Sequence, residues 1–241
     1  MASGHEPARL AYVLCAGAGI RLRPLTRRLP KALLPVSGRP MVFHVLDGLR
    51  AHGIRRFVVN LHAHPDLLHR ALRGYARQHG ISIAFVVEPR LLDTGGAILN
   101  AETHLCEPFW LLNCDIGLAG ISLSAIESRH HRQKNAATLA VRPMLAGELF
   151  NPVGVDRRGR LVRVSGVFGR GGRDHVFLGI HRIEPDALRF LSRTEKIFPI
   201  FGGLYRNLHA AGKLLAAHVC HPALDIDLGT LEGYYAANLT I

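Results

Sequence analysis

The sequence predicts an α/β fold, with a doubly wound mixed sheet that carries helices on both faces. The first observation is that short apolar runs of strand length alternate with stretches whose apolar residues recur at helical spacing. The second is that glycine or proline stands at many of the boundaries between them, where it can end a helix or open a turn. The 241 residues suffice for a single compact domain with two sub-lobes.

Strands and helices alternate regularly in the first half of the chain. Strands are expected where apolar residues cluster over a strand's length, at residues 10–14, 57–61, 81–87, 109–113 and 136–141. Helices are expected at residues 41–49, 65–80, 97–105 and 121–131. Pro65 opens one of these helices, and Gly53 lies where another ends.

The second half is less regular. Residues 153–155 and 161–164 flank a turn at residues 156–159, which predicts a β-hairpin. A loop rich in glycine and arginine is expected over residues 166–174. The other expected elements are strands at 176–180 and 214–219 and helices at 185–191, 204–211 and 230–238.

Composition narrows the class of protein. A hydrophobic content of 48% indicates a globular chain. No run is long enough to cross a membrane and residues 1–9 lack a signal-peptide core, so a cytoplasmic protein without a membrane partner is expected. The cysteines at 15, 106, 114 and 220 show neither zinc nor disulfide spacing, and reduced, mostly buried thiols are expected.

The formal net charge of +12 raises the question of an anionic partner. The basic residues are scattered and are not interleaved with aromatic residues, as they would be in a surface that binds single-stranded nucleic acid. A small polyanionic substrate is therefore expected, and no nucleic acid.

A glycine loop follows the first expected strand. It runs from Leu14 to Thr26 and reads LCAGAGIRLRPLT, and the segment PKALLPV follows from Pro30 to Val36. Glycines let backbone amides approach an anion closely, and Arg21 and Lys31 can bring positive charge to the same place. The pattern predicts a phosphate-binding loop.

These two segments resemble the signature of the sugar nucleotidyltransferases. The matching positions are Gly17, Gly19, Arg21, Leu22, Pro24, Leu25, Thr26, Pro30, Lys31, Leu33, Pro35 and Val36. Asn60-Leu61-His62, Asp93-Thr94-Gly95-Gly96, Asn113-Cys114-Asp115 and Asp227-Leu228-Gly229-Thr230 follow in the family's order. The Asn-Leu-His and Asp-Thr-Gly-Gly motifs look most like those of the bacterial branch of mannose-1-phosphate guanylyltransferases and N-acetylmuramate-1-phosphate uridylyltransferases.

The resemblance implies a Rossmann-like nucleotide-diphospho-sugar transferase fold. It places a nucleotide-binding lobe at about 8–115 and a sugar-binding lobe at about 116–241. It also implies that this sequence lacks the left-handed β-helix domain that follows in longer relatives. A monomer or a homodimer is expected.

The reaction implied by the resemblance is attack by a sugar 1-phosphate on the α-phosphorus of a nucleoside triphosphate, which releases pyrophosphate with the help of Mg²⁺. Such a site needs positive charge and positioning more than a general base, because the nucleophile is already an anion. Arg21 and Lys31 are the expected catalytic residues, and Asp115 and Asp227 the expected metal ligands. Asp225 either joins this metal site or faces solvent.

The resemblance also assigns binding residues. The nucleotide is expected at Ala16, Gly17, Ala18, Gly19, Ile20, Arg21, Thr94, Gly95, Gly96 and Asn113, with UTP or GTP favoured. The sugar is expected at Gly154 and Gly179, where a structural turn or strand glycine is an equally good interpretation.

One departure from the family lies at residues 163–166. Many relatives carry a Glu-Lys-Pro segment there, with a lysine on the sugar phosphate, whereas this chain has no lysine and offers Arg163 or Arg170. The departure keeps an alternative open, namely a catalytically weak nucleotide-sugar-binding or regulatory subunit. A dinucleotide-binding oxidoreductase is disfavoured, since Leu22 replaces the third glycine of that fingerprint and Pro24 follows.

Overall fold

The computed structural model describes residues 8–221 and 228–240. They form two compact units, each assembled from separate stretches of the chain. The loop unit contains Leu10–Leu91, Leu112–Gly120 and the described part of Pro222–Ile241. The second unit contains Leu92–Leu111, Ile121–His221 and the described part of Met1–Arg9. The expected lobes at about 8–115 and 116–241 are, by contrast, each continuous in sequence, and their roles stay predictions.

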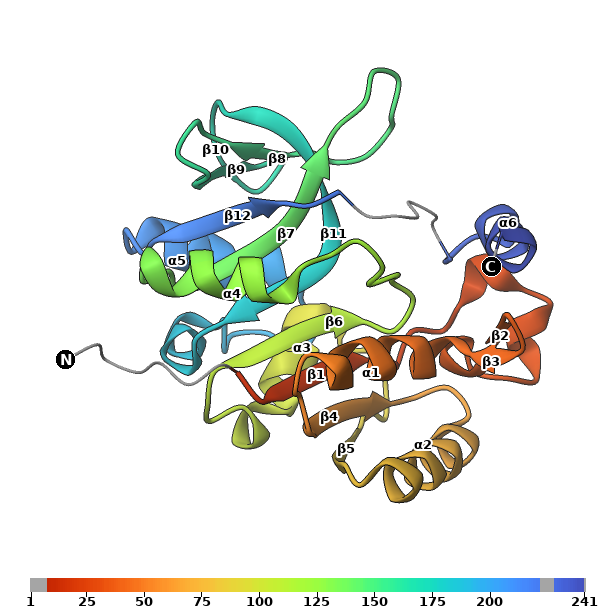
Figure 1. Ribbon diagram of the computed structural model, residues 1–241. Coiled ribbons are helices and arrows are strands. Elements are labelled where there is room, and N and C mark those ends of the chain that lie inside the picture. The colour runs from red at the N-terminus through yellow and green to blue at the C-terminus, as the bar shows by residue number, and fades with distance from the viewer. Residues whose placement is uncertain (1–7, 222–227, 241) are drawn as a thin grey trace. The chain divides into compact units, whose positions relative to one another are not determined.

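Parallel strands form the centre of the loop unit (Figure 1). β1 (Leu10–Leu14) pairs with β4 (Arg56–Leu61), and β4 pairs with β5 (Ser82–Val87). α1 (Met41–Ala51) and α2 (Pro65–His79) provide the crossovers that parallel neighbours require. α2 lies against β4 and β5, which explains why Leu68, Leu72 and Tyr75 recur at helical spacing and are buried.

The connection from β1 to α1 is built from short turns that the sequence reasoning did not anticipate. Three 3-10 turns follow one another, at Ile20–Leu22, Leu25–Arg27 and Lys31–Leu33. A small hairpin of β2 (Pro35–Val36) and β3 (Arg39–Pro40) then leads into α1. The loop unit also contains the C-terminal helix α6 (Leu231–Thr240).

The second unit is a mixed sheet around β7 (Ala137–Pro143). β7 pairs antiparallel with β11 (Arg173–Ile183) and parallel with β12 (Leu215–Val219). β11 continues antiparallel to β8 (Val153–Val155), and the expected hairpin joins β8 to β9 (Leu161–Val164). β9 pairs in turn with β10 (Phe168–Gly169).

The described α-helices of the second unit are α3 (Asp93–Asn100), α4 (Leu123–Arg132) and α5 (Arg206–Ala210). α4 lies against β7 and β12 (Figure 1), and the Ser122 hydroxyl caps it by accepting the Ala125 amide at 3.2 Å. Shorter turns stand at Glu102–His104, Pro185–Phe190 and Phe201–Tyr205. β6 (Phe109–Asn113) carries the chain from the second unit into the loop unit.

This combination of parallel and antiparallel strands with flanking helices confirms the predicted α/β fold class. Several predicted boundaries were wrong. The helix predicted at 185–191 is present as a 3-10 helix, but a π-helical turn precedes α5 and the expected loop at 166–174 contains β10. The strand expected at 176–180 is the middle of the longer β11.

Two expectations from composition can be compared with the structure. All four cysteines are free, and all but Cys106 are buried, as predicted. Among the described residues, no helix is long and apolar enough to span a membrane. The cytoplasmic location stays an expectation.

Candidate functional site

The glycine loop leaves β1 and turns sharply at Gly19. Gly19 has a φ of +59°, a conformation that L side chains rarely adopt. A β-carbon at this position would lie 2.7 Å from the Thr26 methyl carbon, so there is no room for a side chain. The Gly19 carbonyl accepts hydrogen bonds from the Leu22 amide at 3.0 Å and the Thr26 hydroxyl at 2.8 Å. Glycine is therefore required here to fold the loop back onto the following 3-10 turns.

The start of the loop is held by a buried side chain from the neighbouring strand. The Asn60 Oδ1 atom accepts hydrogen bonds from the amides of Cys15 at 2.6 Å and Ala16 at 3.2 Å. The Leu14 carbonyl accepts a further hydrogen bond from the Cys114 amide at 3.2 Å, just beyond β6. These contacts fix the point at which the chain departs from the sheet.

The next three amides are left available. Over residues 8–221 and 228–240, the hydrogen bonds include none donated by the amides of Gly17, Ala18 or Gly19. Gly17 is exposed, and a β-carbon there would meet no atom within 4 Å. Consecutive free amides in a turn of this kind form a concave site for an anion. Ile20 and Arg21 are exposed on the 3-10 turn that follows.

Lys31 and Asp115 form an ion pair in the same unit. The Lys31 ammonium donates to the Asp115 carboxylate, and their side chains are only 13% and 18% exposed. Lys31 opens the third 3-10 turn after Pro30, whereas Asp115 stands two residues beyond β6. The structure therefore brings together one predicted catalytic residue and one predicted metal ligand from segments that are far apart in sequence.

Of the two predicted Mg²⁺ ligands, the structure describes only Asp115. The ion prefers hard oxygen ligands and commonly takes one or two protein carboxylates together with substrate phosphates and water. Asp115 offers such an oxygen, but no group of three or more His, Cys, Asp or Glu side chains that could hold a metal occurs within 8–221 and 228–240. The second predicted ligand, Asp227, and its neighbour Asp225 lie outside the described residues.

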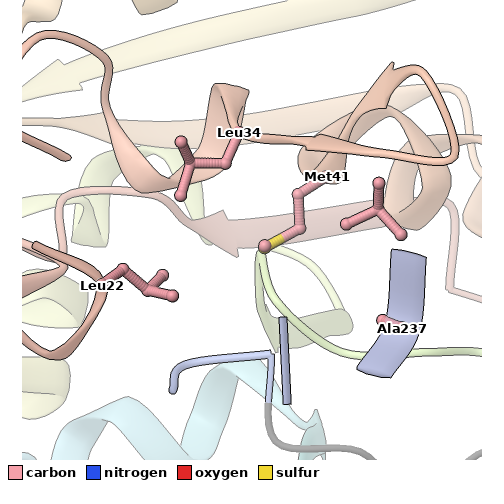
Figure 2. Close-up of a cluster of buried hydrophobic side chains, with 5 residues drawn as sticks. Leu22, Leu34, Met41 and Ala237 are labelled. Carbon is pink, nitrogen blue, oxygen red and sulfur yellow. The ribbon is translucent and has the colours of Figure 1, made fainter. Parts of the chain in front are cut away.

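A hydrophobic cluster supports the loop from α6. Figure 2 shows Met41 between Leu22 and Leu34 on one side and Ala237 of α6 on the other, and Val36 completes the buried cluster. Tyr234 packs at its edge and donates a hydrogen bond to the Pro35 carbonyl at 2.6 Å. Two apolar signature positions, Leu22 and Val36, therefore belong to the packed base of the loop.

The helix predicted at residues 97–105 begins earlier than expected and takes in Thr94–Gly96. α3 begins at Asp93, so both glycines lie in its first turn. The amides of Gly95 and Gly96 donate to the Phe198 carbonyl at 2.9 and 3.2 Å. A β-carbon on Gly95 would clash with the Phe198 ring, and one on Gly96 with the Lys196 carbonyl. This close approach explains both glycines within the second unit, and their role in nucleotide binding stays a prediction.

The other predicted binding residues are Asn113, Gly154 and Gly179, and the structure places each of them in a strand. Asn113 is exposed at the end of β6, in the loop unit. In the second unit, Gly154 faces the Arg163 β-carbon so closely that a side chain would clash. Gly179 has a φ of +76° and lies in β11 where the pairing with β7 shifts register. Sugar binding by these two glycines stays a prediction.

Of the two arginines expected to replace the family lysine, Arg163 already has a partner, since its guanidinium donates to Asp174. Arg170 is exposed.

Sequence reasoning gave no role to Asn60 or to its partner Glu88. The Asn60 Nδ2 atom donates to the Glu88 carboxylate at 2.7 Å, and both side chains are buried. Two signals were available: Asn60 opens the Asn60-Leu61-His62 motif, and it is a lone amide side chain within the apolar run at 57–61, where a buried polar group requires partners.

The chain resembles known proteins in sequence. A family described as nucleotidyl transferase matches residues 10–163. A mannose-1-phosphate guanyltransferase of Yarrowia lipolytica is 31% identical over 199 residues, covering 78% of this chain and 54% of the relative. One of Emericella nidulans is 35% identical over 134 residues, covering 54% of this chain and 36% of the relative. The chain thus spans about half or less of the length of these relatives.

Solved structures agree on the fold. HddC from Yersinia pseudotuberculosis complexed with GMP-PN superposes with a TM-score of 0.75 at 20% identity, over 96% of this chain and 99% of that one. A UDP-glucose pyrophosphorylase complexed with UDP-glucose gives a TM-score of 0.77 at 18% identity, over 96% and 97%. At these identities the likeness concerns the fold.

Proposed function

We propose that this chain, which belongs to the nucleotidyl transferase family, transfers a nucleotidyl group from a nucleoside triphosphate to a sugar 1-phosphate, giving a nucleotide sugar and pyrophosphate. The observation that carries the proposal is the pairing of two features in one unit. Three amides without a partner among the described residues follow β1, and the Lys31–Asp115 ion pair belongs to the same unit.

The chemistry needs charge and positioning at a crowded phosphate chain. The amides of Gly17, Ala18 and Gly19 would bind oxygens of the triphosphate, and Arg21 would add a guanidinium that can bind two oxygens at once. A sugar-phosphate oxygen then attacks the α-phosphorus, and the bond from that phosphorus to the pyrophosphate oxygen breaks. The Lys31 ammonium would stabilise the negative charge that develops on the phosphate oxygens.

Asp115, with Asp227, would hold Mg²⁺, which neutralises phosphate charge when bound. The Lys31 ammonium, which pairs with the Asp115 carboxylate, would thereby lie beside the phosphate oxygens that this metal binds.

GTP and mannose 1-phosphate are the first substrates to test, because the curated relatives named above are mannose-1-phosphate guanyltransferases. UTP with another sugar 1-phosphate is the second choice. We propose a monomer or a homodimer, which light scattering on the purified chain distinguishes.

The test is a pyrophosphate-release assay of five nucleoside triphosphates against several sugar 1-phosphates, with and without Mg²⁺. Release from at least one pair is expected, together with its loss in Asp115→Ala. If no pair reacts, or if Asp115→Ala reacts as the unsubstituted chain does, the proposal is wrong.

A second candidate function is a nucleotide-sugar-binding subunit with little activity. The observation in its favour is that Arg163, one of the two possible substitutes for the family lysine, is engaged by Asp174. Calorimetric binding of a nucleotide sugar without any turnover would support this alternative.

A further inference from the structure

Asn60 stands at a junction between the sheet and the glycine loop. It is the fifth residue of β4, its side chain is 3% exposed, and the strand around it is apolar. A buried amide must satisfy an acceptor oxygen and two donor hydrogens, and leaving them unpaired is costly. Its partners therefore indicate what this side chain does.

The partners fix which way the Asn60 amide points. The Cys15 and Ala16 backbone amides can only donate, so the atom facing them is the oxygen. The Glu88 carboxylate, when ionised, can only accept, so the atom facing it is the nitrogen. Glu88 follows β5 and is 2% exposed. The carboxylate thus holds the Asn60 oxygen toward the loop.

This contact determines which backbone amides of the loop are hydrogen-bonded and which stay available. Asn60 takes up the amides of residues 15 and 16, and the three amides that follow donate to nothing in the described residues. Without the Asn60 oxygen, the amides of Cys15 and Ala16 would need other acceptors at the point where β1 ends. The loop would then shift relative to the sheet.

We propose that Asn60 and Glu88 are positioning residues, which set the glycine loop in register for the triphosphate without touching the substrate. The inference rests on the proposed function, and it adds a specific pair of residues to it. Its alternative is that the two side chains only stabilise the fold.

Exchanging the amide and the carboxylate between positions 60 and 88 distinguishes the positioning role from a purely structural one. Asn60→Asp places two carboxylates face to face in a buried site, where they cannot both ionise. At neutral pH the contact between residues 60 and 88, which holds the loop in place, is therefore lost. Adding Glu88→Gln restores a donor opposite an acceptor, because the introduced glutamine amide can donate to the introduced aspartate. That aspartate can still accept both loop amides. The double variant carries the same net charge as the natural pair.

The pyrophosphate-release assay compares kcat/KM for the triphosphate with KM for the sugar 1-phosphate. For Asn60→Asp we expect kcat/KM for the triphosphate to fall about 100-fold at neutral pH, as expected for a reacting group displaced by about 1 Å. The KM for the sugar 1-phosphate should change little. Activity should recover partly toward acid pH, where one proton is shared by the pair. The double variant should return to within about threefold of the natural chain, as the hydrogen bonds are restored.

Asn135→Asp is the matched control, because Asn135 is a 4% exposed asparagine of the second unit that donates to Gln133 and Thr138. It should destabilise the chain without changing the triphosphate KM. If Asn60→Asp does not fold, Asn60→Ala and the double variant carry the test, with the same expected contrast between loss and recovery.

The outcomes keep the two proposals apart. If the natural chain releases no pyrophosphate from any substrate pair, the proposed function fails. If the natural chain is active and the Asn60 variants lower only the melting temperature, or if the double variant recovers nothing, the positioning role is overturned and the function stands.

Discussion

The glycine loop and the contact between α4 and β11 use polar side chains in opposite ways. Between α4 and β11, the guanidinium of Arg182 is completely buried and donates to both carboxylate oxygens of Glu127, at 2.8 and 3.0 Å. Glu184 accepts from the His130 ring at 2.9 Å. In the glycine loop, by contrast, the amides of residues 17–19 donate to nothing within the described chain.

The difference shows that polar groups serve structure where they are buried and paired, and can serve binding where they are unpaired at the surface. A charge pair removed from water must be fully hydrogen-bonded, or the fold loses stability. A loop that leaves donors unpaired at the surface loses little, because water satisfies them until an anion arrives. Substitutions of the buried charges between α4 and β11 should therefore change stability, and substitutions of the groups that bind the anion should change activity.

The largest expected effect tests the activity side of this comparison. Lys31→Ala should lower kcat/KM about 100- to 1,000-fold, the usual loss when one charge-stabilising donor is removed from an active site. The loss in the free energy of unfolding should be smaller than the loss of transition-state stabilisation to which this fall in kcat/KM corresponds. Lys213→Ala is the control, since this lysine of the second unit packs over the Phe190 ring. An unchanged kcat/KM in Lys31→Ala would contradict the proposed role.

The next effect tests the stability side. Glu127→Gln leaves the buried Arg182 guanidinium with less compensating charge, and we expect a loss of about 3 kcal/mol in the free energy of unfolding. Urea unfolding measures it. Asp186→Asn breaks a matched but exposed pair with Arg189 and should cost less than about 1 kcal/mol. Equal losses in the two variants would show that burial does not distinguish them.

A glycine pair sharpens the comparison within the loop itself. Gly19→Ala should destabilise the chain by about 2 kcal/mol, because the left-handed conformation disfavours a side chain and the Thr26 methyl stands in its way. Gly17→Ala meets open space and should leave the unfolding free energy unchanged. Thermal and urea unfolding of both variants provide the test, and a similar loss in both would rule out the geometry described for Gly19.

The last effect is a gradual one, a pH dependence of stability that belongs to the second unit. Burial lowers the pKa of His181 from 6.5 to about 3. Between these values the unfolded chain binds a proton that the folded chain does not, so stability falls as the pH falls below 6.5. The slope from this one group is about 1.4 kcal/mol per pH unit.

His181→Gln removes this titration and can still bond the Tyr205 hydroxyl, which lies 2.8 Å from the His181 ring. Urea unfolding at several pH values between 7 and 4 should show a shallower slope for the variant. Parallel curves for the two proteins would assign the dependence to other groups.

The regular part of the fold was predictable from local pattern. The helix over 65–80 and the strands at 10–14 and 57–61 follow from apolar spacing and from Pro65 and Gly80, which act within a few residues. The predicted start of α3 was wrong for a different reason. Its two glycines are dictated by the Lys196–Phe198 segment, about one hundred residues away in sequence, and no local pattern reveals that approach.

In the candidate site, too, local sequence patterns were predictive and contacts between distant segments were not. The signature predicted Lys31 and Asp115 as functional residues, and the structure adds that they contact one another. The signature could not predict that Asn60 holds the loop, because Asn60 and its partners come from three separate segments of the chain. The remaining predicted ligand, Asp227, lies outside the described residues.

The packing of α6 beneath the glycine loop has a consequence for protein synthesis. Leu22, Leu34 and Met41 leave the ribosome long before Ala237, which belongs to the last described helix. Since domains begin to fold as they emerge, the strands of the loop unit can pair before the base of the loop exists. A ribosome that stops ahead of α6 would release a chain with these apolar side chains exposed. Quality control could recognise such a chain by that surface, although most of its sheet is already formed.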